Sequence, residues 1–324
     1  MDSQILKSMP LHLHTEVYED YLSDEGIRFL RRYGEGTKEG CLTRDFLIPE
    51  DMTLQSIHAM IQKAYGWENT HLHLFELDKE DFEILTEDCI ENWEELVGEV
   101  FPFPGIFKDF LLDVEGRSLE KSFTGPYNKK PIIPKEEHKK SLENFFEKVK
   151  EIPVFNEKKK EWENTPLEKA SLKELQASRI FEGSMNELLE HLEIRDVLYF
   201  EDEKVEKDES FPLGKGLIYC YDFGDHWTVK ISLRKSWEHL LKEGLITGEE
   251  LAKAERIVAK EHRPICLHRQ GVNLFDDVGG LEGFARFLQE VYEGETLEAR
   301  EELLEYGKNM GWSKEKISPY DTLS

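Results

Sequence analysis

The chain has 324 residues, of which 39% are hydrophobic and 34% charged, and its formal net charge is −26 at pH 7. This length is sufficient for one large domain or two moderate ones, and the 19 Phe, 11 Tyr and 6 Trp residues argue against a disordered chain. Because affinity for phosphate groups comes largely from Lys and Arg, the acidity excludes non-specific binding to nucleic acid or to an anionic membrane surface. We expect a cytoplasmic protein, because no apolar run is long enough for a signal peptide or a membrane span and the four cysteines include no Cys-x-x-Cys pair.

Two segments near the N-terminus predict β-strands. Residues 11–18 alternate between apolar and polar side chains, which is the period of a half-buried strand. Residues 41–48 follow a glycine-rich loop and end before a proline. His12 and His14 lie on the polar side of the first strand, so we expect both imidazoles to be exposed.

The clearest helix pattern covers residues 54–65. Thr53 is suited to the N-cap of this helix, and Gly66 is suited to the left-handed position after its end. His58 lies within the apolar stripe, so we expect a buried histidine with hydrogen-bond partners. Residues 71–77 then alternate as a further strand.

The composition changes in the middle of the chain. Residues 135–163 contain eight Lys and eight Glu, which is typical of an exposed helix with ion pairs between successive turns, and a second helix pattern covers residues 172–192. We therefore expect a discontinuous core formed by residues 1–95 and 210–324. A charged, mainly helical insertion or subdomain at residues 96–209 interrupts it.

The strand signal returns at residues 217–233, where two alternating runs flank Gly224 and predict a hairpin. Helix patterns follow at residues 237–260 and in two C-terminal segments, the second of which covers residues 297–306. This mixture predicts an α+β fold, with a mixed, mostly antiparallel sheet that packs against helices and carries a largely helical insertion.

His71 and His73 are the first candidates for chemistry. Two residues apart on the predicted strand, they share one face with Cα atoms about 6.6 Å apart, close enough for two imidazoles to bind one metal ion. The alternative is a core edge where both histidines form hydrogen bonds with carboxylates. Asp222 and Asp225 bracket the predicted hairpin turn, and they are either turn residues or a carboxylate pair for a metal ion or for acid–base catalysis. The candidate catalytic residues are therefore His71, His73, Asp222 and Asp225, and the candidate ligands of a divalent metal ion are His71, His73 and Asp222.

Five further residues are candidates for ligand binding. Asp277 precedes Gly279 and Gly280, and this segment is either a helix cap or a loop whose backbone N–H groups bind an anion. Tyr221 and Trp227 flank the predicted hairpin turn and complete the set.

Three segments, in this order, resemble one family: Gly-Trp-Glu-Asn-Thr-His-Leu-His-Leu-Phe at residues 66–75 together with the helix before it, Tyr-Cys-Tyr-Asp-Phe-Gly-Asp-His-Trp at 219–227, and Asp-Val-Gly-Gly at 277–280. They resemble the plasmid Ri ORF-three-like family, which is also met as the passenger TnpR-type protein of insertion elements. The resemblance covers residues 40–95 and 215–290, and it implies an α+β fold rather than a particular reaction. At residues 274–276 the chain has Leu-Phe-Asp where the family has Pro-Pro-Glu.

Three functions stay open. The first is a binding or interaction module linked to mobile elements, with a protein partner. The second is a metal-dependent, hydrolase-like enzyme in which His71 and His73 meet Asp222 and Asp225. The third is an acidic DNA mimic that binds a basic protein. The enzyme hypothesis requires an imidazole within about 5 Å of these carboxylates in an open cleft, and it fails if the imidazoles are sealed in the core.

Overall fold

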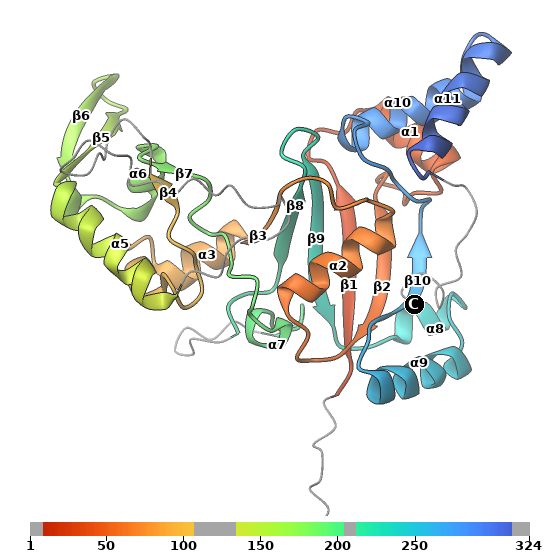
Figure 1. The fold of residues 1–324 in the computed structure, drawn as a ribbon, viewed down its shortest axis with the longest axis horizontal. Coiled ribbons are helices and arrows are strands. Elements are labelled where there is room, and N and C mark those ends of the chain that lie inside the picture. Colours follow the sequence, from red (N-terminus) through yellow and green to blue (C-terminus); the bar gives the residue numbers. More distant parts are fainter. Residues whose placement is uncertain (1–8, 107–133, 204–211, 313–324) are drawn as a thin grey trace, which may run out of the picture. The chain divides into compact units, whose positions relative to one another are not determined.

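The structure is a computed structural model that describes three parts of the chain: residues 9–106, 134–203 and 212–312 (Figure 1). Two parts of the predicted insertion, 107–133 and 204–209, lie outside the described residues. The fold is mixed α+β, as the sequence predicts. Across the described parts, no helix combines the length and the apolar character that a membrane span requires. All four cysteines are free.

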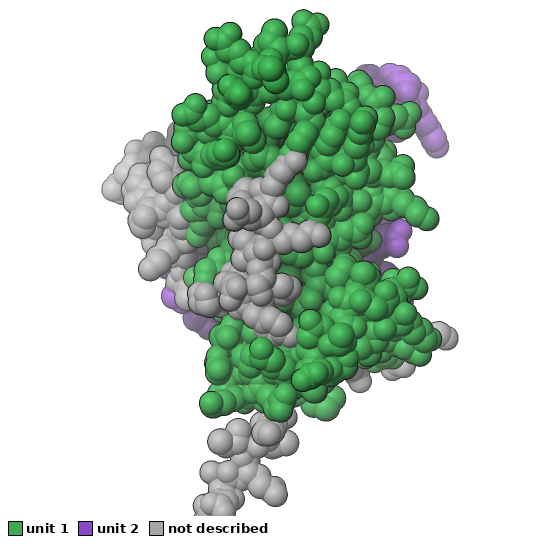
Figure 2. Space-filling view, turned by 90° about the vertical axis from the view of Figure 1, so that its right-hand side faces the viewer, with its two compact units in different colours: residues 1–75, 190–324 green, residues 76–189 purple. Residues whose placement is uncertain are grey.

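The chain divides into two compact units (Figure 2): unit 1 comprises residues 1–75 and 190–324, and unit 2 comprises residues 76–189. The predicted boundaries of the insertion, at 95/96 and 209/210, lie about twenty residues later than these. The difference at the first boundary arises because the acidic stretch after residue 75 packs within unit 2. Its Trp93 is fully buried, and the ring centroids of Trp93 and Phe181 lie 5.8 Å apart.

Unit 1 contains a six-stranded sheet in the order β10-β2-β1-β9-β8-β3 (Figure 1). The pairs β10–β2, β2–β1, β1–β9 and β9–β8 are antiparallel. The strands are β1 (Leu11–Tyr18), β2 (Leu42–Ile48), β3 (His73–Leu77), β8 (Leu217–Tyr221), β9 (Trp227–Arg234) and β10 (Ile265–Gln270). The predicted hairpin is therefore confirmed as β8 and β9, and its turn presents residues 222–226 at one end of the sheet.

The helices of unit 1 are α1 (Asp24–Tyr33), α2 (Leu54–Tyr65), α7 (Ile194–Val197), α8 (Glu238–Lys242), α9 (Gly248–Glu261), α10 (Gly280–Glu293) and α11 (Leu297–Asn309). Helix α2 packs on one face of the sheet, where the Tyr65 and Thr15 hydroxyls lie 2.9 Å apart. As predicted, the Thr53 side chain accepts a hydrogen bond from the N–H of Ser56, and Gly66 ends the helix with a φ of 94°.

Unit 2 contains α3 (Lys79–Thr86), α4 (Ile90–Leu96), β4 (Gly105–Ile106), α5 (Lys135–Lys148), β5 (Glu151–Asn156), β6 (Glu161–Pro166), a short 3-10 helix (Leu167–Lys169), α6 (Leu172–Ala177) and β7 (Phe181–Glu182). The predicted helix at residues 135–163 is wrong in its second half, which forms the β5–β6 hairpin. Pro153 lacks a backbone N–H group, so it cannot donate the hydrogen bond that a continuation of α5 would require. A two-stranded hairpin accommodates this proline.

Two other predicted helices are shorter than expected. The helix predicted at residues 172–192 ends after α6, because Arg179 and Gly183 adopt left-handed φ values of 55° and 84° and β7 lies between them. The helix predicted at residues 237–260 is divided into α8 and α9. Gly244 adopts a φ of 69° between them, and Thr247 begins α9 with a capping box.

The prediction that His12 is exposed is wrong. His12 is 4% exposed, and its imidazole stacks on Trp237 with ring centroids 3.6 Å apart. His12 Nε2 and His14 Nδ1 each lie 2.9 Å from Asp45 Oδ1, and His268 Nδ1 lies 3.2 Å from Asp45 Oδ2. We call these four residues the Asp45 cluster. Burial opposes ionisation of Asp45, but the three imidazole hydrogen bonds outweigh it and hold the pKa of this carboxyl well below its usual range.

Candidate functional site

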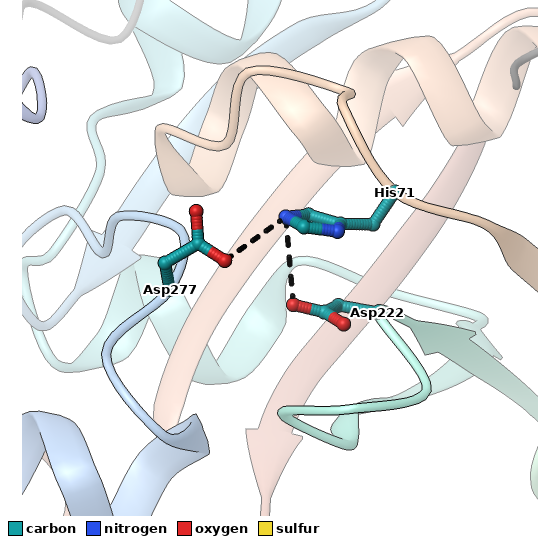
Figure 3. Close-up of side chains that lie close together, drawn as sticks. All are labelled: His71, Asp222 and Asp277. Atoms are coloured by element: carbon teal, nitrogen blue, oxygen red, sulfur yellow. Dashed lines mark ion pairs between the residues drawn. The ribbon is translucent and has the colours of Figure 1, made fainter.

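One histidine and two aspartates from three separate segments meet at one place in unit 1 (Figure 3). His71 lies in the loop between α2 and β3, Asp222 follows β8, and Asp277 lies in the loop before α10. His71 Nε2 is 3.6 Å from Asp222 Oδ2 and 3.4 Å from Asp277 Oδ1, and the three potential ligand atoms all lie within 4.8 Å of one another. We call these three residues the cation site.

The Asp222 side chain is held by its own turn. Its Oδ1 accepts a hydrogen bond from the N–H of Gly224 at 3.0 Å, which leaves Oδ2 facing His71. The N–H of Asp222 donates to the carbonyl of Leu72 at 2.9 Å, so the turn is tied to the segment that carries His71. Asp222 has a φ of 54°, a left-handed conformation that aspartate tolerates better than most residues.

Asp225, the other predicted carboxylate of this turn, does not face His71. Its Oδ2 accepts hydrogen bonds from the N–H groups of Val278 at 3.0 Å and Gly279 at 2.8 Å. A Cβ atom at Gly280 would collide with the carbonyl oxygen of Asp225, so the turn and the Gly279-Gly280 segment are in close contact. The N–H of Gly279 is therefore occupied by Asp225 and is not open to an anionic ligand.

The aromatic candidates Tyr221 and Trp227 are buried beneath the site. Trp67 contacts both, with ring centroids 5.2 Å from Tyr221 and 5.3 Å from Trp227. The Tyr221 ring also lies edge-on to His71 at 5.9 Å, and its hydroxyl accepts a hydrogen bond from the N–H of Thr70. Burial, with the negative charge of the nearby Asp276, raises the pKa of Tyr221 to about 12. Through these contacts, Tyr221 and Trp227 pack against the loop that carries Trp67 and His71.

Asp276 is a buried neighbour of the site and is not among the predicted site residues. Its Oδ2 accepts a hydrogen bond from the N–H of Glu68 at 2.8 Å, while its Oδ1 is buried and has no hydrogen-bond partner among the described residues. Burial raises the pKa of this carboxyl, and the charge of Asp277 adds to the effect. The family that the chain resembles has an acidic residue at this position, and this was the signal in the sequence that could have identified Asp276.

His73 does not join the cation site. The strand β3 begins at His73, so His71 lies outside the regular alternation that would have placed both imidazoles on one face. The His73 ring stacks on His58 with centroids 3.5 Å apart, and its Nε2 is 3.2 Å from a carboxylate oxygen of Glu190. Only His71 of this pair reaches the aspartates.

His58 is a buried, hydrogen-bonded core histidine, as predicted. Its Nδ1 lies 2.8 Å from the hydroxyl of Tyr219, and its Nε2 lies 3.0 Å from the side-chain oxygen of Asn69. Burial, with the neighbouring His73, lowers the pKa of His58 to about 4. A neutral imidazole fits both contacts, because the tyrosine hydroxyl donates to one nitrogen and the other nitrogen donates to the amide oxygen.

The charge and the ligand atoms of the cation site fit a positive ion. Two carboxylates face one imidazole, and the side chains of His71, Asp222 and Asp277 are 29%, 10% and 60% exposed. His71 Nε2 itself is inaccessible to water and has no hydrogen-bond partner within the described parts of the chain. Imidazole and carboxylate are common ligands of Zn²⁺ and Mn²⁺, so the donor set fits a divalent metal ion.

Comparison with known proteins identifies the family. None of the curated proteins compared with the chain matches it. Among solved structures, a protein of unknown function from Methanosarcina mazei Go1 is similar at 15% identity over 98% of this chain and 99% of its own, with a TM-score of 0.34. The model of the family described as plasmid pRiA4b ORF-3-like protein matches residues 37–105 and 184–321, which is more than half of the chain and includes all three residues of the cation site. The chain therefore belongs to the plasmid pRiA4b ORF-3-like protein family.

Proposed function

We propose that the protein is a binding module that holds a divalent metal ion between His71, Asp222 and Asp277. One observation carries this proposal: three ligand atoms from three segments lie within 4.8 Å of one another, and no hydrogen bond joins them. At 3.4 and 3.6 Å, the contacts of His71 Nε2 with the aspartates are longer than ordinary N–H···O hydrogen bonds. One imidazole cannot neutralise two carboxylates, so negative charge remains that would attract a cation. The spacing of the three ligand atoms also leaves space for an ion between them.

The donor set favours some ions over others. One nitrogen and two carboxylate ligands suit Mn²⁺, Fe²⁺ or Zn²⁺ better than Ca²⁺, which prefers six to eight oxygen ligands. Three protein ligands also leave coordination positions open, as in metal sites that bind a water molecule or a further ligand. An oxygen donor of a partner molecule is the natural occupant of these positions.

Metal titration tests the proposal. Calorimetric titration of the chelator-treated protein with Mn²⁺ and with Zn²⁺ should show one ion per chain. We expect His71→Ala, Asp222→Asn and Asp277→Asn each to weaken binding by at least about tenfold, because each removes a ligand. Asparagine is chosen since it tolerates the left-handed φ of both aspartates.

His226→Asn is the matched control, because His226 is exposed in the same turn and is not part of the cation site. This variant should bind as the unmodified protein does. Equal binding by all four variants, or no uptake of either ion by the unmodified protein, would overturn the proposal. A hydrolase-like activity needs the same ion, so the titration is also the precondition for that alternative.

We further infer a cytoplasmic interaction module linked to mobile elements. Family membership supports the link, the four free cysteines support a reducing compartment, and the net charge of −26 supports a basic protein partner. A DNA mimic is the stricter form of this idea, and it predicts binding to a DNA-binding partner that weakens steeply with salt. Cell fractionation tests the location, and recovery of the protein outside the cytoplasm would contradict it.

A further inference from the structure

We infer that Asp225 is a positioning residue that sets the Asp277 carboxylate at the cation site. The inference rests on the proposed function, because it concerns how that site is assembled. Asp225 Oδ2 accepts hydrogen bonds from the N–H groups of Val278 and Gly279, the two residues that directly follow Asp277. Asp225 thus holds the backbone next to Asp277 in place, although Asp225 is not one of the three ligands.

The loop that carries Asp277 needs such an anchor. Asp277, Gly279 and Gly280 have φ values of 58°, 84° and 68°, so three of four consecutive residues are left-handed. For a residue other than glycine this conformation is unfavourable, and surrounding contacts must hold it. The missing side chain of Gly280 allows the Asp225 backbone to approach the loop closely, which adds a steric contact to the two hydrogen bonds.

The turn at residues 222–226 therefore positions two of the three ligands, Asp222 and Asp277. Asp222 provides a carboxylate to the cation site, and Asp225, three residues later, holds the loop that provides the other. The turn is closed by its own hydrogen bonds, from His226 N–H to the Asp222 carbonyl and from Gly224 N–H to Asp222 Oδ1. The distance between the two carboxylates is thereby set by a single, internally bonded segment.

The contacts also indicate which chemical property of Asp225 matters. A single oxygen accepts both hydrogen bonds, so the side-chain oxygen of asparagine can replace it, whereas alanine cannot. A direct metal ligand behaves differently, because asparagine is a much poorer ligand than a carboxylate. Alanine and asparagine at this position therefore separate a positioning residue from a ligand.

Mn²⁺ titration of four variants tests the inference: Asp225→Ala, Asp225→Asn, Asp277→Asn and the double variant Asp225→Ala/Asp277→Asn. We expect Asp225→Ala to weaken binding about tenfold and Asp225→Asn to stay within about threefold of the unmodified protein. The double variant should bind within about twofold of Asp277→Asn alone, because the anchor acts only through Asp277. Amide hydrogen exchange at Val278 and Gly279, measured without metal, should accelerate in Asp225→Ala and not in Asp225→Asn.

The outcomes distinguish this inference from the proposed function. If the unmodified protein binds no Mn²⁺ or Zn²⁺, the proposed function fails. If it binds Mn²⁺ and Asp225→Ala binds equally well, only the positioning role fails. If Asp225→Asn is as weak as Asp225→Ala and the losses in the double variant multiply, Asp225 is a ligand and the inference is overturned.

Discussion

Unit 1 contains two clusters of histidine and aspartate that differ in their composition and their hydrogen bonding. In the Asp45 cluster one carboxylate is surrounded by three imidazoles, with contacts of 2.9 to 3.2 Å, and Asp45 is almost fully buried. In the cation site one imidazole faces two carboxylates at 3.4 and 3.6 Å, and the side chains are partly exposed. The same residue types thus form a hydrogen-bonded structural cluster in one place and an electrostatically incomplete site in the other.

The difference shows that composition alone does not identify a metal site. Three imidazoles and a carboxylate look like a better ligand set than one imidazole and two carboxylates. In the Asp45 cluster, however, each imidazole already uses one ring nitrogen in a hydrogen bond to the carboxylate, which makes that nitrogen unavailable to a metal ion. The three imidazoles are those of His12, His14 and His268. The cation site keeps its ligand atoms within 4.8 Å of one another with no hydrogen bond between them, and this property distinguishes it.

The largest expected effect is a loss of folding stability when the Asp45 cluster, but not the cation site, is disrupted. Asp45→Asn should lower the free energy of unfolding by about 3 to 5 kcal/mol, because it removes the buried charge that accepts hydrogen bonds from three imidazoles. Urea denaturation measures the change, with Asp277→Asn as the exposed control. A loss below about 1 kcal/mol in Asp45→Asn would show that the Asp45 cluster is not structural.

The pH dependence of stability extends the comparison to His58, another fully hydrogen-bonded histidine. Its pKa is lowered to about 4 in the folded protein, from an ordinary value of 6.5. The unfolded chain therefore takes up the proton first, so stability is complete above pH 6.5 and is lost as the pH falls toward 4, by at most about 3 kcal/mol. His58→Gln should flatten the denaturation curve in this window, and an unchanged slope would contradict the assignment.

A somewhat smaller effect is expected from the ion. At a free Mn²⁺ concentration 100 times the dissociation constant, binding to the folded state alone stabilises the protein by about 2.7 kcal/mol. The melting temperature should rise accordingly and return to its starting value with a chelator. An equal rise in Asp277→Asn would place the ion elsewhere.

The smallest expected effect concerns the site without metal. In a chelating buffer, Asp222→Asn should change the free energy of unfolding by no more than about 0.5 kcal/mol, because it relieves repulsion from Asp277 and asparagine still accepts the hydrogen bond from Gly224. A loss above about 1 kcal/mol would show that the His71 contacts already stabilise the fold as an ion pair.

Local patterns in the sequence predicted the elements that depend on local physics. Thr53 and Gly66 mark the ends of α2, and the alternation around Gly224 marks the β8–β9 hairpin. The β5–β6 hairpin was not predicted, because a run of Lys and Glu fits an exposed helix and an exposed hairpin equally well.

The site was less predictable than the fold because it depends on contacts between distant segments. His71 and Asp222 were selected for their chemistry, but His73 was included since the exact start of β3 could not be read from the alternation. Asp277 was selected as a loop residue, and only the structure places it beside His71. The burial of His12 depends on Trp237, more than 200 residues away, so no local pattern could show it.

A crystal of the protein grown or soaked with Mn²⁺ tests the central claim most directly, because anomalous scattering locates the ion. We expect one strong anomalous peak bonded to His71 Nε2, Asp222 Oδ2 and Asp277 Oδ1, at about 2.0 to 2.2 Å from each. A peak at the Asp45 cluster, or no peak at His71 in crystals equilibrated with excess Mn²⁺, would contradict it.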